Sequence, residues 1–232
     1  MSTLFDCRDE AQLLAGMRQA RQAIARGELV VMPTDTVYGV AADAFSPSAV
    51  AALLAAKGRG RQQPPPVLVA GLTTVRALVS DLPEPIERLV SAHWPGGLTV
   101  VLPAQPSLSW DLGETRGTVA VRMPAHRLAL ELLEETGPLA VSSANLTGRA
   151  AAVDAFGARE MLGESVEVYL DDGPSLTGVP STIVDATGIA FGGTGRVRVL
   201  RYGAVSFDEL ERVLGDALEP ETGPDERADG PA

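Results

Sequence analysis

The stretch ELVVMPTDTVYGV, residues 28–40, joins a short apolar run to a polar segment that begins at a proline. Its first half is apolar and β-branched, which predicts a buried strand that Pro33 ends. Hydroxyl side chains then recur at alternate positions, at Thr34, Thr36 and Tyr38. Hydroxyl groups just past the carboxyl end of a strand lie where open α/β sheets bind small ligands. The same groups could instead cap local backbone atoms, and this stretch alone favours neither interpretation.

The segments on either side of this stretch predict helices. Residues 9–26 carry apolar side chains at helical spacing and are followed by Gly27, so we expect an amphipathic helix that leads into the strand. On the other side, residues 41–42 are expected to lead into a helix. Ser46 and the proline after it then give a capping hydroxyl and a helix start for residues 49–56.

The sequence KGRGR, residues 57–61, follows the second helix. Cations at the carboxyl end of a helix can simply be favourable partners of the helix dipole. However, the two glycines release the chain from the helix and would let Lys57 and Arg59 wrap an anion. In an acidic protein such a cluster favours the anion-binding interpretation.

The rest of the chain alternates helical and strand patterns, which indicates a mixed α/β domain. We expect helices over residues 73–79, 84–93, 126–136, 154–162 and 206–214, and strands over residues 67–70, 98–102, 118–124, 139–142, 166–170, 180–185 and 196–201.

Three of these predicted strands carry polar groups that could form a site. Arg122 ends a strand, where its planar fork could hold a carboxylate bidentately, although a structural ion pair with a nearby acid is the common alternative. Hydroxyls and an amide again follow a strand at residues 142–148. Strand periodicity places Arg196 and Arg198 on one face and Arg201 on the other.

Composition limits the kinds of protein this can be. The chain has 232 residues and a formal net charge of −11, of which −5 falls on residues 215–232. We therefore predict one domain over residues 1–214 and an acidic, disordered tail over residues 215–232. The net charge of −6 that is left for the body argues against broad non-specific binding of nucleic acid.

Several classes of site and location are excluded by what the sequence lacks. Cys7 is the only cysteine, so no internal disulfide framework or thiolate metal cluster is expected, and no protein ligands for a metal can be identified. The sequence has no run of about 18 apolar residues, which a membrane span would require, and its amino terminus lacks the pattern of a secretory signal. There is no P-loop, GxGxxG or GxSxG motif. A small-anion or nucleotide site built from hydroxyls and cations remains, with no reaction named by the residues themselves.

Seven motifs occur in the order typical of one family. These are PTDTVYG, KGR before a proline-rich entry to a strand, WPGGLTVVL, VAVRMP, SSANLTG, GVPSTIVD and VRVLRYG. The chain thus resembles the YrdC-like family, the L-threonylcarbamoyladenylate synthases, in its short single-domain form, over roughly residues 28–214.

The resemblance implies a fold and a reaction. The fold would be a twisted mixed β-sheet with flanking helices around a deep electropositive cavity, and not a Rossmann fold. The reaction would condense L-threonine, bicarbonate and ATP into threonylcarbamoyl-AMP and pyrophosphate, with Mg²⁺ accompanying ATP. Lys57 and Arg59 would neutralise charge during catalysis, and Thr34 and Tyr38 would form the cavity wall. The resemblance assigns Thr36, Arg122, Ser142 and Ser181 to threonine, and Lys57, Arg59, Thr118, Asn145 and Arg196 to the nucleotide.

The same resemblance implies partners and leaves alternatives. A separate transferase would use the product to modify tRNA at adenosine 37 in the cytoplasm, with at most a weak tRNA contact here and no membrane. A ribosome-associated or RNA-binding module, or a weakly active paralogue, could share the fold. Family members often carry Asn and His where this chain has Gln63 and Leu68. Loss of the histidine would remove a polar contact to threonine.

Overall fold

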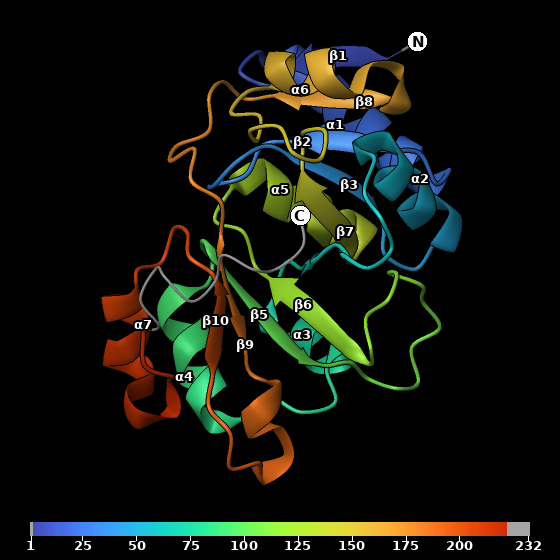
Figure 1. The fold of residues 1–232 in the computed structure, drawn as a ribbon. Helices are drawn as coiled ribbons and strands as arrows, with labels where there is room; N and C mark the ends of the chain where they lie inside the picture. Colours follow the sequence, from blue (N-terminus) through green and yellow to red (C-terminus); the bar gives the residue numbers. More distant parts are fainter. Residues whose placement is uncertain (1, 222–232) are drawn as a thin grey trace.

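The computed structural model describes residues 2–221, whose ten strands form one mixed, twisted sheet with helices on both faces (Figure 1). The strand order is β1-β8-β2-β3-β7-β4-β6-β5-β9-β10. The strands are β1 (Thr3–Asp6), β2 (Val30–Met32), β3 (Gly39–Asp43), β4 (Val67–Leu68), β5 (Leu98–Pro103), β6 (Thr118–Arg122), β7 (Leu139–Ser143), β8 (Val168–Asp171), β9 (Thr182–Asp185) and β10 (Arg198–Arg201). This mixed sheet confirms the expected fold class.

Seven helices are found among the described residues 2–221. They are α1 (Glu10–Ala25), α2 (Pro47–Lys57), α3 (Leu72–Leu78), α4 (Glu84–His93), α5 (Arg127–Thr136), α6 (Ala155–Leu162) and α7 (Phe207–Leu214), with short 3-10 turns at Gly163–Ser165, Thr187–Gly192 and Gly215–Ala217. No helix within residues 2–221 is long and apolar enough to cross a membrane.

The stretch that opens the sequence analysis forms two strands and the loop between them. β2 pairs antiparallel with β3, with Val30 opposite Ala41, and β3 pairs antiparallel with β7. The prediction that residues 41–42 lead into a helix is therefore wrong. Alanine has a high helix propensity, but here Ala41 and Ala42 are fully buried in the middle of the sheet, and tertiary packing overrides propensity.

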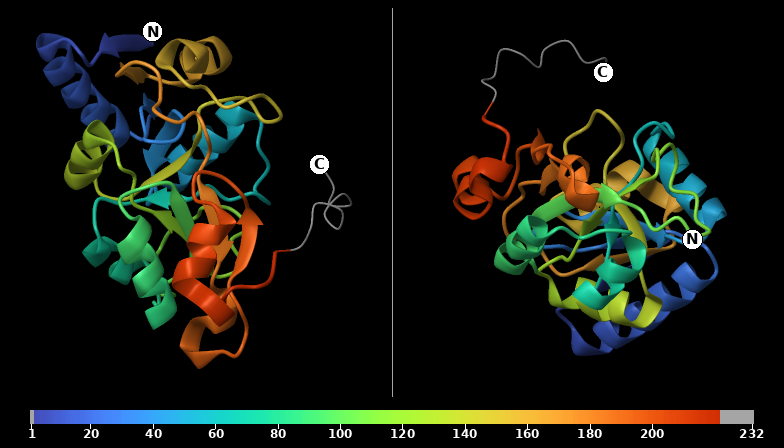
Figure 2. Two further views of the ribbon diagram at one scale, coloured as in Figure 1. Left: turned by 90° about the vertical axis from the view of Figure 1, so that its left-hand side faces the viewer. Right: turned by 90° about the horizontal axis from the view of Figure 1, so that it is seen from below.

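The sheet has two halves, which are joined through β4, the two-residue strand that lies between β7 and β6. In the amino-terminal half, α1 and α5 lie side by side on one face, while α2 lies on the other (Figure 2). Met17 and Ile24 of α1 pack with Leu128 and Leu132 of α5 against β2 and β8. In the other half, α4 and α7 pack together beside β5, β9 and β10.

The end of α2 sets the direction of the chain that follows. Gly58 lies in the left-handed region with φ of 61°, and its amide donates to Ala55 and Leu54. That conformation favours glycine, because a side chain there is strained. It ends the helix after Lys57, as the sequence predicts, and sends Arg59 in a new direction.

The predicted boundary between body and tail is too early. After Leu214 the chain forms a further turn, and Leu218 is buried at 5% exposure in the core beside Val197. The amide of Val197 donates to the carbonyl of Ala217, and the amide of Glu219 donates to that of Val197, at 2.7 and 2.8 Å. A single leucine in an acidic segment gives no periodic signal, so the sequence did not predict that Leu218 packs on the rest of the domain. Residues 222–232 of the predicted tail lie outside the described part of the chain.

Candidate active site

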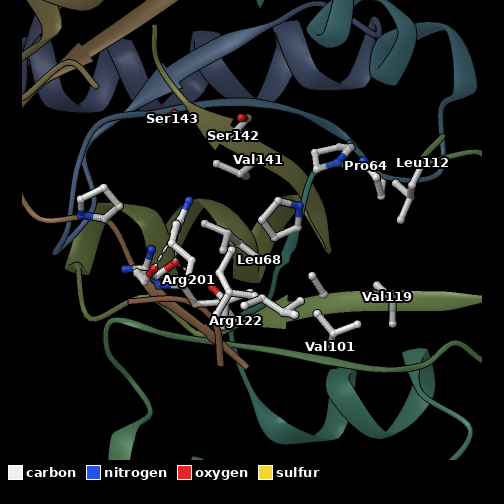
Figure 3. Close-up of a pocket in the computed structure, with 18 of the residues that line it drawn as sticks. Pro64, Leu68, Val101, Leu112, Val119, Arg122, Val141, Ser142, Ser143 and Arg201 are labelled. Atoms are coloured by element: carbon white, nitrogen blue, oxygen red, sulfur yellow. Dashed lines mark hydrogen bonds between the residues drawn. The ribbon is translucent and has the colours of Figure 1, made fainter. Parts of the chain in front are cut away.

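A cavity of about 600 Å³ lies where the two halves of the sheet meet. Figure 3 shows Ser142 and Ser143 on β7 along one side, and Arg122 and Arg201 close together on the opposite side. The wall also includes the β2–β3 loop, the prolines that follow Gln62, and parts of β5, β6 and β9. A volume of this size is typical of a small-molecule site.

Most of the predicted site residues line this cavity. They are Thr34, Thr36, Tyr38, Arg59, Thr118, Arg122, Ser142 and Ser181. Three predicted residues, Lys57, Asn145 and Arg196, are not among the lining residues.

Arg122 is held at the end of β6 by three acceptors. Its Nη2 pairs with Oδ1 of Asp35 at 2.6 Å, Nη1 donates to Oγ1 of Thr36 at 2.9 Å, and Nε donates to the carbonyl of Gly96 at 2.9 Å. The Arg122 and Asp35 side chains are only 7% and 12% exposed. Arg122 therefore lines the cavity and also forms the buried ion pair that the sequence left open as an alternative.

The threonine hydroxyls continue this network in one direction. Thr34 Oγ1 donates to the carbonyl of Val37 at 2.6 Å, so the hydroxyl of Thr36, at 3.0 Å, is the donor to Thr34. Thr36 Oγ1 in turn accepts from Arg122. The hydroxyls of Thr34 and Thr36 thus fix the loop and the guanidinium together, and Thr36 is one of the residues that line the cavity.

The Tyr38 hydroxyl serves the fold. It donates to the carbonyl of Gly173 at 2.5 Å and accepts from the amide of Asp172 at 3.1 Å, and burial raises its pKa well above the usual range. Only the body of the ring is left for the cavity. Thr118 likewise donates its hydroxyl to the carbonyl of Thr115 at 2.7 Å while it lines the cavity.

Arg59 reaches the cavity from the loop after α2. Its Nη1 donates to Oγ of Ser142 at 3.0 Å, and its buried Nε has no hydrogen-bond partner among the described residues. Burial and the nearby charge of Arg201 both lower the pKa of Arg59. Arg59 pairs with no carboxylate among residues 2–221, so its guanidinium brings an unbalanced positive charge to the cavity wall and favours an anionic ligand.

Lys57, predicted to bind the nucleotide, is not among the lining residues, and its ammonium group is occupied by protein acceptors beside the cavity-lining Ser143. Its ammonium group donates to the carbonyl of Ser143, to the carbonyl of Asn145 at 2.6 Å and to the Asn145 side chain at 3.3 Å. The side-chain amide of Asn145 donates to the carbonyls of Leu146 and Arg149. Lys57 is thus hydrogen-bonded to Asn145 at the carboxyl end of β7, although the two residues lie 88 positions apart in the sequence.

The predicted role of Arg196 is also not supported by its position. β10 begins at Arg198, and Arg196 is exposed on the turn before it. Arg201 lines the cavity instead. The pairing of β10 with β9 shifts register between Val199 and Arg201, so consecutive side chains at Leu200 and Arg201 both reach the cavity. Such a bulge breaks the simple alternation from which we assigned the faces of this strand.

Two further residues were missed by sequence reasoning. Thr99 on β5 lies with its hydroxyl 2.8 Å from that of Ser181. Arg116 lines the cavity from a left-handed backbone conformation with φ of 52°, which is uncommon for a side chain larger than Asn. Neither residue carries a local sequence signal that separates it from an ordinary strand or loop residue.

Positive charge dominates the cavity. Arg59, Arg122 and Arg201 are close enough that the charge of Arg201 contributes to lowering the pKa of both others, although burial is the larger cause. Within residues 2–221 only Arg122 of these three pairs with a carboxylate. Glu114 and Asp185 also line the cavity, but Asp185 binds Arg198 and Thr187. The arrangement favours an anion with several negative groups.

Comparison with known proteins gives consistent results. The family described as telomere recombination, Sua5–YciO–YrdC, matches residues 22–203. A putative threonylcarbamoyl-AMP synthase of Mycobacterium tuberculosis is 53% identical over 215 residues, which cover 93% of this chain and 96% of that protein. The threonylcarbamoyl-AMP synthase of Pyrococcus abyssi is 36% identical over 201 residues, 86% of this chain and 57% of that one.

Solved structures agree with this. The crystal structure of P. abyssi Sua5 complexed with L-threonine has a TM-score of 0.84 at 34% identity and covers 94% of this chain. This chain spans 62% of that longer protein. E. coli YciO, at 22% identity and a TM-score of 0.77, shares the fold. The chain therefore belongs to the Sua5–YciO–YrdC family.

Proposed function

We propose that the protein is a threonylcarbamoyl-AMP synthase, which condenses L-threonine, bicarbonate and ATP into threonylcarbamoyl-AMP and pyrophosphate. The names of its relatives and the threonine-bound Sua5 structure support this proposal. The observation that carries it is the gathering of Arg59, Arg122 and Arg201 around one hydroxyl-lined cavity. All three substrates bring negative charge to such a site.

The residues divide into two groups that suit the substrates. Thr36 and Arg122, which are hydrogen-bonded to each other, and Ser181, which is hydrogen-bonded to Arg201, all line the cavity and would bind threonine. Arg59, with Ser142, reaches in from the side of β7 and would bind the phosphates of ATP. Ser142 was assigned to threonine by resemblance. Because its hydroxyl touches Arg59, it would mark the border between the two substrates.

The reaction needs orientation and charge neutralisation more than proton transfer. The threonine amine would attack the carbon of bicarbonate, forming a C–N bond and releasing water to give a carbamate. A carbamate oxygen would then attack the α-phosphorus of ATP, and pyrophosphate would leave. Both steps bring anions together, so fixed guanidinium groups lower the barrier by positioning and by stabilising charge.

The metal and partners remain part of the proposal. Mg²⁺ would enter with ATP, held mainly by phosphates, because Glu114 and Asp185 are the only acids lining the cavity among the described residues. The product would pass to a separate transferase that modifies tRNA at adenosine 37, in the cytoplasm. Any tRNA contact by this chain would be weak.

The test is pyrophosphate release in reactions that contain L-threonine, bicarbonate and Mg-ATP, with each omitted in turn. We expect release only in the complete mixture. L-Serine in place of threonine serves as a specificity control. Equal release without threonine, or without added bicarbonate in carbonate-depleted buffer, would overturn the proposal and indicate simple ATP hydrolysis or amino-acid adenylation.

A further inference from the structure

Two segments of the chain cross between the halves of the sheet. Residues 123–126 lead from β6 to α5, and residues 172–181 lead from β8 to β9 (Figure 1). β6 and β8 are not neighbours in the sheet, because β2, β3, β7 and β4 lie between them. The strand pairing therefore does not join these two crossings, and a direct link between them has to come from the residues of the crossings themselves.

His126 and Asp172 provide such a link. Nε2 of His126 lies 3.4 Å from Oδ2 of Asp172, and the two side chains are 15% and 30% exposed. Nδ1 of His126 is buried and has no hydrogen-bond partner among the described residues. Burial lowers the pKa of His126, although the charges of Asp172 and Asp35 act in the opposite direction. The imidazole is therefore neutral at pH 7, with its proton on the nitrogen that faces the carboxylate.

Each crossing also holds the loop between β2 and β3. From the first crossing, the amide of Ala125 donates to Oδ1 of Asp35 at 2.9 Å. From the second, the hydroxyl of Thr177 donates to the carbonyl of Asp35 at 3.2 Å, and the amide of Asp172 donates to the hydroxyl of Tyr38 at 3.1 Å. The β2–β3 loop is thus bound by both crossings, at its middle and at its end.

We propose that His126 and Asp172 form a positioning pair, which holds the two crossings together and so fixes the β2–β3 loop in the conformation that binds substrate. The inference rests on the proposed function and adds to it two residues that do not line the cavity. Neither side chain touches substrate; both act through the loop that carries Thr36. Because a shift of about 1 Å in a binding group can cost on the order of 100-fold in rate, such a distant pair can control affinity.

The test is a double-mutant cycle on threonine binding, measured by calorimetric titration without ATP or bicarbonate. His126→Phe keeps a ring and removes its polar nitrogens, and Asp172→Ala removes the carboxylate. Each should raise the Kd for threonine by about 3- to 30-fold through misplacement of the loop. The double variant should bind no more weakly than the weaker single variant, because the two residues act as a unit.

A conservative variant separates positioning from bulk. The amide nitrogen of His126→Gln can take the place of Nε2 and donate to Asp172, so its Kd should stay within about threefold of wild type. The same two substitutions at His93, the only other histidine in the sequence, are the matched controls. His93 ends α4, which packs with α7 in the other half of the molecule, and its variants should bind threonine as wild type does.

Amide hydrogen exchange tests the pair independently of the reaction. Peptides that cover residues 123–126 and 172–181 should exchange faster in His126→Phe and in Asp172→Ala than in wild type, while His126→Gln and the His93 variants should not differ. Peptides from α4 and α7 report any global loss of stability. If His126→Phe does not fold, Asp172→Ala and His126→Gln carry the same comparison.

Two results would overturn the inference: unchanged exchange in both crossings, or losses of threonine affinity that simply add in the double variant. A wild-type protein that binds no threonine would instead count against the proposed function. The exchange rates would still decide whether His126 and Asp172 hold the crossings together.

Discussion

The two walls of the cavity are built alike, yet they balance charge differently. On the β7 side, Lys57 is buried and donates to the carbonyls of Ser143 and Asn145, and Arg59 lines the cavity. On the β6 side, Arg122 is buried and Arg201 faces the cavity beside Ser181. Each wall thus has one cation whose contacts with protein acceptors stabilise the fold and one whose charge is free for a ligand.

The difference lies in the partners of the two buried cations. Arg122 has the carboxylate of Asp35, whereas Lys57 has only carbonyl and amide oxygens. Burial, helped by the charge of Arg59, accordingly lowers the pKa of Lys57 to about 8. A buried cation whose partners are dipoles alone has a lowered pKa, while a carboxylate partner favours the charged form. Each difference leads to a measurable consequence.

The largest effect should come from removing Asp35. Asp35→Ala leaves the buried guanidinium of Arg122 without its counter-charge, so we expect the free energy of unfolding to fall by about 3 to 5 kcal/mol in urea denaturation. The double variant Asp35→Leu with Arg122→Met removes both charges and should recover much of that loss. A single variant as stable as wild type would show that the pair is not a structural element of this wall.

Lys57 should give the β7 wall a distinctive pH dependence. Its folded pKa of about 8 is below the unfolded value of 10.5, so between these pH values the unfolded chain binds more protons and stability must rise with pH. The free energy of unfolding of wild type, minus that of Lys57→Met, should increase over this range by on the order of 3 kcal/mol. Taking the difference cancels the opposite trend from Cys7, whose pKa is raised to about 12. A flat difference would mean that Lys57 titrates normally.

Arg59 tests the cavity-facing cation on the same wall. Arg59→Ala should weaken Mg-ATP binding by roughly 1.5 to 3 kcal/mol, because it removes charged hydrogen bonds to phosphate, and should leave the melting temperature nearly unchanged. Calorimetric titration measures the affinity, with Arg61→Ala, whose side chain pairs with Asp111 on the surface, as the control. Unaltered ATP affinity in the Arg59 variant would remove this residue from the nucleotide site.

The smallest effects should come from the carboxyl-terminal segment, which belongs to neither wall. Truncation after Glu221 keeps every residue from 2 to 221 that the structure describes, and it should not change the melting temperature. Truncation after Leu214 removes Leu218 from the core. The melting temperature should then fall by roughly 3 to 12 °C, which corresponds to the loss of one buried leucine side chain. Thermal unfolding of the two truncated proteins decides the point. Equal melting temperatures would show that the Leu218 contact adds nothing.

The local elements of this fold could be predicted from sequence. The helix over residues 84–93 begins and ends where the pattern places it, and Ser46 caps α2 through its side chain. Capping residues, glycine stops and apolar periodicity act within a few positions, so one sequence carries that information. The same is true of the polar groups at strand ends, including Arg122 and Ser142.

Long-range geometry could not be predicted in the same way. The acceptors of Lys57 lie 86 and 88 residues further along the chain, and no rule of sequence spacing predicts contacts at such separations. Arg201 reaches the cavity because of a bulge in β10, which defeats the alternation expected of a strand. We mistook part of β3 for the start of a helix because alanine has a high helix propensity. The burial of Ala41 and Ala42 in the sheet outweighs that propensity. The roles of Lys57, Asn145 and Arg196 were assigned by resemblance, and none of the three is among the residues that line the cavity.

The most direct measurement follows the carbon of bicarbonate into the product. Protein is incubated with ¹³C-labelled bicarbonate, L-threonine and Mg-ATP, and the adenylate formed is analysed by mass spectrometry before it hydrolyses. We predict one molecule that contains adenosine monophosphate, threonine and the labelled carbon, made only when all three substrates are present. An adenylate of threonine without the label, or AMP and pyrophosphate with no labelled adduct, would contradict the assignment of this cavity to threonylcarbamoyl-AMP synthesis.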